Sequence, residues 1–220
     1  MNLSDVERAR YYMIEQQIRP WDVSDEAVLG LLATVKREDF VPSAQKSLAF
    51  VDMAIALPDG QSMLQPRIEA RLLQDAAAQA TDKVLEIGTG TGYTAALLAN
   101  QAQRVISLEI NPGIADMARA NLQRAGLHNV EVRQADGSEG AAADAPFDVI
   151  LLGGSVSEVP QTLLSQLKIG GRLVGIVGDE PIMHAQVITR TSDTNFVATQ
   201  KWDDNAPRLL NFPEPDTFKF

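Results

Sequence analysis

The sequence has 220 residues, 19 of them basic and 29 acidic, which gives a formal net charge of −10 and the length of one ordinary domain. It contains no cysteine, which excludes a disulfide scaffold, a thiolate metal site and a cysteine nucleophile. The two histidines are isolated, so we expect no metal site. The acidity argues against nucleic acid or an anionic membrane surface as a partner. No apolar run approaches the length of a membrane span, so we expect a soluble, cytoplasmic protein.

Residues 1–80 contain no glycine-rich turn, and their apolar positions recur with helical spacing. This pattern predicts three helices, over residues 6–18, 25–37 and 67–79. Ser24 is the expected N-cap of the second helix. Residues 40–66 have no such pattern and are expected to form a loop. We therefore interpret this part of the chain as an N-terminal helical cap that carries a substrate loop.

Residues 81–204 alternate between strand and helix patterns. Strands are expected over residues 84–87, 104–109, 130–134, 147–152 and 171–177. Helices are expected between them, over residues 93–101, 112–125 and 158–168. This alternation predicts an α/β fold with a parallel sheet covered on both faces.

The end of this region changes pattern and reads as a hairpin. Residues 186–190 and 196–201 are strand-like and flank the turn-forming residues 192–195. We therefore predict a Rossmann-like fold whose mostly parallel, seven-stranded sheet ends in an antiparallel hairpin. Residues 205–220, rich in proline and phenylalanine, are expected to be an extended tail laid on the body.

The strongest signal for a binding site is a glycine-rich turn at the first strand-to-helix junction, Glu86-Ile-Gly-Thr-Gly-Thr-Gly92. Glycines are needed where the backbone turns tightly and must approach a ligand without a Cβ between them. Glu109 ends the next predicted strand, where an acid usually accepts the hydroxyls of a ribose. Asp136, followed by Gly137, ends the third. Acids at consecutive strand ends line the edge where open α/β sheets bind ligands.

Two classes of cofactor compete for this site. The pyrophosphate of a dinucleotide favours a helix N-terminus without nearby carboxylates, whereas S-adenosylmethionine has no phosphate and carries a sulfonium and an ammonium cation. Glu86 beside the turn, the Gly-x-Gly-x-Gly spacing and the closing hairpin favour S-adenosylmethionine. In this interpretation the glycines hold the methionine part, Glu109 the ribose, and Asp136 with Gly137 the adenine edge. The predicted cofactor-binding residues are Glu86, Gly88, Thr89, Gly90, Gly92, Glu109, Ile110, Asp136 and Gly137.

From about residue 13 to residue 178 the sequence resembles the protein-L-isoaspartate O-methyltransferase family. The matching segments are residues 35–42, 84–93, 136–137, 145–148, 158–160 and 166–173, in the family's order. The resemblance implies methyl transfer from S-adenosylmethionine to the side-chain carboxylate of isoaspartyl residues in damaged proteins or peptides, as a repair step. Such a carboxylate is already ionised at neutral pH, so the reaction needs no general base.

The resemblance is weaker in the segments that meet the acceptor. Where the family has approximately Gly-Gln-Thr-Ile-Ser-Gln-Pro, this chain has Gly60-Gln-Ser-Met-Leu-Gln-Pro66, so Ser62 keeps the first hydroxyl and Leu64 replaces the second. Gln61 and Ser62 are therefore the expected catalytic residues, with Ser155 as another source of a hydroxyl. Two alternatives stay open: the same cofactor with a different small-molecule or protein acceptor, and a catalytically silent cofactor-binding module.

Overall fold

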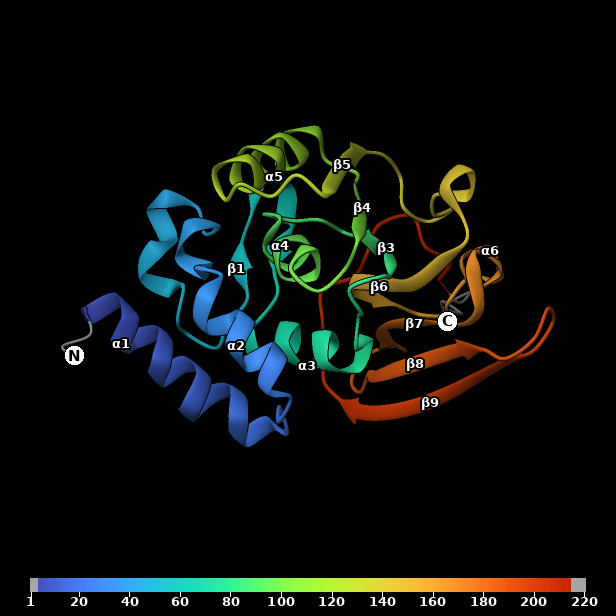
Figure 1. Ribbon diagram of the computed structural model, residues 1–220, viewed down its shortest axis with the longest axis horizontal. Helices are drawn as coiled ribbons and strands as arrows, with labels where there is room; N and C mark the ends of the chain where they lie inside the picture. The colour runs from blue at the N-terminus through green and yellow to red at the C-terminus, as the bar shows by residue number, and fades with distance from the viewer. Residues whose placement is uncertain (1–3, 215–220) are drawn as a thin grey trace, which may run out of the picture.

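A seven-stranded sheet forms the centre of the computed structural model, which describes residues 4–214 (Figure 1). The strand order is β5-β4-β3-β6-β7-β8-β9. The first five strands in this order pair in parallel, and the last two pairings are antiparallel. The predicted fold is therefore confirmed. The strand bounds are β3 (Lys83–Ile87), β4 (Arg104–Glu109), β5 (Val130–Gln134), β6 (Phe147–Val156), β7 (Leu167–Val177), β8 (His184–Arg190) and β9 (Phe196–Asp203).

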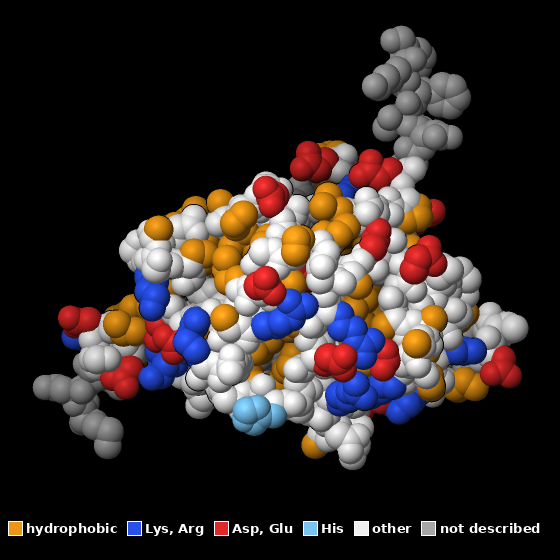
Figure 2. All heavy atoms as spheres, turned by 90° about the horizontal axis from the view of Figure 1, so that it is seen from above, with side chains coloured by type: hydrophobic (Ala, Val, Ile, Leu, Met, Phe, Trp, Pro, Cys, Tyr) orange, Lys and Arg blue, Asp and Glu red, His pale blue; other side chains and the backbone are white. Residues whose placement is uncertain are grey.

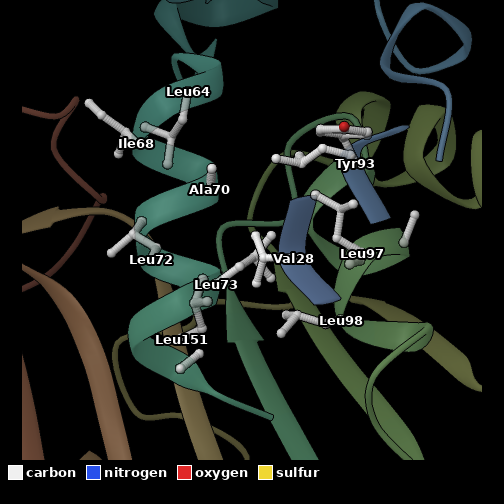
Figure 3. Close-up of a cluster of buried hydrophobic side chains, with 14 of the residues drawn as sticks. Val28, Leu64, Ile68, Ala70, Leu72, Leu73, Tyr93, Leu97, Leu98 and Leu151 are labelled. Atoms are coloured by element: carbon white, nitrogen blue, oxygen red, sulfur yellow. The ribbon is translucent and has the colours of Figure 1, made fainter. Parts of the chain in front are cut away.

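The central strands are apolar on both faces because both faces are covered. Alternate residues of β3 belong to different clusters: Val84 packs into one core and Leu85 into the other. Helices α2, α3 and α4 cover the first face, and Figure 3 shows their side chains meeting, with Val28 between Leu73 and Leu97. The second face is covered by α6 together with residues near the C-terminus. The helix bounds are α2 (Glu26–Thr34), α3 (Pro66–Ala76), α4 (Tyr93–Ala99), α5 (Pro112–Arg124) and α6 (Gln161–Ser165).

The N-terminal segment begins with α1 (Asp5–Tyr12), which continues as a π-helical stretch over Met13–Ile18. The predicted cap of α2 is wrong by one residue: the Asp25 carboxylate, not Ser24, accepts the free backbone amides of the first turn. The predicted loop over residues 40–66 contains two short paired strands, β1 (Ile55–Ala56) and β2 (Ser62–Met63).

Several other boundaries differ from the prediction by a few residues, and two of them involve the pairing of β6. The expected helix over residues 158–168 is shorter, because the chain already pairs with β6 at Leu167 to begin β7. Strand β6 continues beyond residue 152, to Val156, and Ser155 forms a bridge with Arg208 of the tail. The described part of the tail turns at Leu210 and Asn211, where Asn211 has a φ of +63°, and residues 215–220 lie outside the described part. Among residues 4–214, none of the helices is both long and apolar enough to cross a membrane.

Candidate cofactor and acceptor site

The glycine-rich turn lies at the carboxyl end of β3 and leads directly into α4. Gly88 and Gly90 have φ values of +89° and +54°, in the region that favours glycine. The backbone amide of Gly88 donates to the Leu108 carbonyl oxygen at 2.8 Å, so the turn is fixed to the neighbouring strand. Gly92, at φ +85°, packs against Leu122 of α5. The turn therefore exposes its first two glycines and uses the third for helix packing.

Glu109, at the end of β4, connects the glycine-rich turn to this strand by a hydrogen bond. Its Oε2 accepts from the backbone amide of Gly90 at 2.9 Å, and its Oε1 from that of Asn111 at 3.0 Å. The side chain is buried but lines a cavity next to the turn. An ionised carboxylate has about four lone-pair sites, so Glu109 keeps acceptor capacity for a ligand hydroxyl.

Glu86 lies behind the turn and is fully buried. The Ser107 hydroxyl donates to its carboxyl group, and the oxygen atoms of Ser107 and Thr89 are 2.6 Å apart. Burial raises the pKa of Glu86 to about 8, against the opposing effect of the hydrogen bond from Ser107. Glu86 thus faces the interior of the protein, and any effect on a ligand passes through Ser107 and Thr89.

Asp136 and Gly137 follow β5 at the same edge of the sheet. Asp136 Oδ1 accepts from the backbone amide of Ser138 at 2.9 Å, and its Oδ2 accepts from Asn211 Nδ2 at 2.7 Å. Burial raises the pKa of Asp136, but these hydrogen bonds outweigh it and the net shift is downward. A Cβ at residue 137 would lie 2.3 Å from Ile87 Cγ2, so only glycine fits there.

One cavity brings most of the predicted residues together. Its walls come from the glycine-rich turn, the ends of β4 and β6, the tail, and the loop over residues 57–64, here called the acceptor loop. Its volume is about 50 Å³. The predicted residues on its walls are Gln61, Ser62, Gly88, Gly90, Glu109, Ile110 and Gly137. Thr89 lines a smaller adjoining cavity together with Ser62 and Leu64. Glu86, Gly92 and Asp136 are outside both sets of lining residues.

The two candidate hydroxyls have different surroundings. Ser62 is half-buried on the cavity wall, beside Gln61. Ser155 is fully buried, and its Oγ donates to the Ala206 carbonyl oxygen at 2.8 Å. Leu64 is 5% exposed and packs into the core beside Ile68 (Figure 3). Ser62 is therefore the hydroxyl that remains available at the cavity.

The structure adds residues that the sequence did not indicate. A Cβ at Gly153 would lie 2.5 Å from the Gly88 carbonyl oxygen, and one at Gly154 would lie 2.7 Å from the Pro207 carbonyl oxygen. These glycines let β6 approach the turn and let the tail approach β6. Only the structure shows the close contacts that require glycine at these two positions.

The residues at this edge of the sheet fit S-adenosylmethionine. Across residues 4–214 there is no group of three or more acidic or histidine side chains arranged to hold a metal ion. Gly90 lies on the cavity wall with no Cβ between its backbone and the cavity, Glu109 offers a carboxylate to hydroxyls, and Asp136 carries charge at the neighbouring strand end. On the face shown in Figure 2, basic side chains lie among acidic ones.

The strand order and the position of this site define the class of protein. The site lies at the carboxyl ends of the parallel strands, as expected for an open α/β sheet, and the sheet closes on the antiparallel pair of β8 and β9. The chain is a Rossmann-like methyltransferase that uses S-adenosylmethionine.

Comparison with known proteins identifies the family. Residues 8–203 match the family model described as protein-L-isoaspartate(D-aspartate) O-methyltransferase (PCMT). A protein-L-isoaspartate O-methyltransferase of Koribacter versatilis is 43% identical over 201 residues, covering 87% of this chain and 90% of that protein. One from Methanoculleus marisnigri is 43% identical over 178 residues, covering 81% of each chain. The chain belongs to the PCMT family.

Solved structures agree with this assignment. A protein-L-isoaspartate O-methyltransferase structure superposes with a TM-score of 0.77 at 26% identity, covering 92% of this chain and 65% of that chain. A second structure, from Plasmodium falciparum in complex with S-adenosyl-L-homocysteine, has a TM-score of 0.78 at 16% identity, with 94% and 99% coverage. The second likeness shows that the fold is shared.

Proposed function

We propose that this chain transfers the methyl group of S-adenosylmethionine to the side-chain carboxylate of an isoaspartyl residue in a damaged protein or peptide. The name of the Koribacter relative supports this acceptor. The observation that carries the proposal is that one cavity joins the acceptor loop to the residues expected to bind the cofactor. Gln61 and Ser62 of the loop line this cavity together with Gly88 and Glu109. The acidic, cysteine-free composition supports a cytoplasmic location for the reaction.

The cofactor, when bound, supplies an electrophilic methyl group on a cationic sulfonium. Gly88 and Gly90 would hold its methionine part, Glu109 its ribose hydroxyls, and Asp136 with Gly137 its adenine. The protein then has to hold one oxygen of the acceptor carboxylate in line with that methyl group, so it catalyses the reaction by proximity and orientation.

The acceptor side follows from the loop. The Ser62 hydroxyl and the Gln61 side chain can donate to one carboxylate oxygen and leave the other free to react. Leu57 also lines the cavity, so part of its wall is apolar. No proton has to be removed from the acceptor, because the carboxylate is ionised at neutral pH.

The test is methyl transfer from labelled S-adenosylmethionine to an isoaspartyl peptide, with the same peptide containing ordinary aspartate as the control. We expect label in the isoaspartyl peptide above the aspartyl control, and loss of that excess in Glu109→Gln. Equal labelling of the two peptides would refute the proposed acceptor.

Leu64 favours a second candidate, the same transfer to a different acceptor. An apolar, buried side chain stands where the family offers a second hydroxyl, so the acceptor site has one donor fewer. If a panel of small carboxylic acids and unmodified peptides accepts methyl groups faster than the isoaspartyl peptide, this candidate replaces the first. Tight binding of S-adenosylhomocysteine without transfer to any acceptor would favour a silent cofactor-binding module.

A further inference from the structure

The segment over residues 207–212, here called the C-terminal strap, lies across the cofactor cavity. In Figure 1 the red trace leaves β9 and runs back past the ends of β6 and β3. Ser155 of β6 fixes the start of the strap: its backbone amide donates to the Pro207 carbonyl oxygen at 2.7 Å, and its carbonyl oxygen accepts from the Leu209 amide at 2.9 Å. Arg208 adds a second attachment, donating to the Gly178 carbonyl oxygen at 2.9 Å.

The strap fills space that a cofactor needs. The Leu209 side chain lies against the turn, since a Cβ at Gly88 would come within 2.8 Å of Leu209 Cδ2. Phe212 is only 7% exposed and lines the cavity together with Ile87 and Leu108. With the strap in place the cavity measures about 50 Å³, whereas pockets that enclose a small molecule usually measure roughly 300 Å³ or more.

The strap also contacts Asp136, the residue assigned above to the adenine. Asn211 donates from Nδ2 to Asp136 Oδ2 at 2.7 Å, in an exposed hydrogen bond. Phe212, the next residue, places its aromatic ring on the cavity wall that Ile87 and Leu108 also line. An amide N–H and a ring are the two features that an adenine would present at this position. Asn211 adopts φ +63°, which asparagine tolerates better than most residues.

We propose that the C-terminal strap is a gate that competes with the cofactor: Asn211 and Phe212 occupy the adenine half of the site, and the strap must leave this position before S-adenosylmethionine binds. This inference rests on the cofactor-binding roles proposed above for Gly88 and Asp136. It concerns the rate and affinity of cofactor binding and is independent of the acceptor.

The test measures the association rate and affinity of S-adenosylhomocysteine, by stopped-flow and calorimetry, for variants of the strap. Asn211→Gly removes the amide but keeps the positive φ, and Asn211→Asp places a like charge against Asp136. We expect association roughly two- to ten-fold faster in Asn211→Gly, the range of one modest hydrogen bond, and at least as fast in Asn211→Asp. Asn195→Gly, in the turn between β8 and β9, is the matched control and should leave the rate unchanged.

Unchanged or slower association in both Asn211 variants would overturn the gate, because the strap would then not obstruct the cofactor. Hydrogen exchange gives a second measurement: saturating S-adenosylhomocysteine should speed exchange of the Leu209 amide, which donates to Ser155 in the closed arrangement. Slower exchange of that amide would show the strap staying in place over the ligand and would also overturn the gate. Methyl transfer to the isoaspartyl peptide tests the proposed acceptor separately.

Discussion

Arg37 Nη2 donates a hydrogen bond to the backbone carbonyl oxygen of Leu64 at 2.8 Å, inside the core. The guanidinium is 1% exposed, pairs with the Glu69 carboxylate and donates from Nε to the Ala49 carbonyl oxygen at 3.1 Å. One buried arginine therefore fixes the acceptor loop to the cap and to α3. The position of Ser62 at the cavity depends on this attachment, although Arg37 itself is outside the cavity walls.

Replacing Arg37 by methionine should destabilise the fold severely. The change leaves Glu69 buried without its partner, and breaking a buried pair in this way typically costs about 3–5 kcal/mol in the free energy of unfolding. Denaturant unfolding measures this. The control is Arg119→Met, which breaks an exposed pair with Asp116 and should change stability by less than about 1 kcal/mol. Equal effects of the two substitutions would contradict the role given to Arg37.

Glu86→Gln should change how stability depends on pH. The carboxyl group has a pKa of about 8 in the folded protein against 4.5 as its ordinary value. Between pH 4.5 and pH 8, Glu86 is protonated in the folded state but not in the unfolded state. The wild-type free energy of unfolding therefore falls as pH rises from 4.5 towards 8. Glutamine carries no titrating proton, so the variant should gain stability relative to wild type across this window, by up to about 1.4 kcal/mol per pH unit. Urea unfolding at a series of pH values gives the slopes.

The control for that experiment is Glu158→Gln, which changes an exposed acid. Its pH dependence should follow wild type. Parallel curves for Glu86→Gln and wild type would show that Glu86 is not held protonated by burial.

Leu64→Ser should raise methyl transfer to an isoaspartyl peptide, because it restores a hydroxyl next to the cavity that Ser62 lines. Leu64→Ala is the matched control. Both variants lose the packing of the leucine side chain, which costs about 2–5 kcal/mol in the free energy of unfolding, but only Leu64→Ser gains a hydrogen-bond donor. A hydrogen bond to a charged group contributes about 1.5–3 kcal/mol, so the serine variant should exceed the alanine variant at least several-fold. Initial rates below the unfolding temperature measure the difference, and equal rates would mean that the hydroxyl does not reach the acceptor.

Glu109→Gln should weaken binding of S-adenosylhomocysteine by roughly ten-fold or more, because an amide replaces the carboxylate that accepts the ligand hydroxyls. It also weakens the attachment of Gly90, whose backbone amide donates to Glu109. Calorimetry measures the affinity. Glu131→Gln, on the exposed side of β5, is the control and should bind as wild type does; an equal affinity for Glu109→Gln would contradict its assignment to the ribose.

The strands and the cofactor edge could be predicted from the sequence because their signals are local. The run from Val84 to Ile87 is apolar at every position except Glu86, and it ends at a glycine turn, so both the buried strand and the site follow from short-range patterns. The last two strands were found from their turn residues. Element bounds near Leu167 and Ser155 were wrong because they depend on pairing with distant segments.

The parts of the site that could not be predicted depend on long-range contacts. Nothing near Asn211 in the sequence indicates that it reaches Asp136, 75 residues earlier. The same holds for Arg37, which lies 27 residues before the carbonyl of Leu64 that it contacts. Glu86 was predicted from its sequence position beside the turn, but the structure turns its side chain away from the cavity and towards Ser107.

Whether this site methylates isoaspartyl carboxylates is decided by the ratio of kcat/KM for an isoaspartyl peptide to that for its aspartyl isomer. The two peptides have the same composition and charge, so only the placement of the carboxylate at the cavity distinguishes them. We expect a ratio far above one, with the gain of one methyl group on the isoaspartyl peptide. A ratio near one, or methyl transfer to neither peptide, would show that the site does not select isoaspartyl carboxylates.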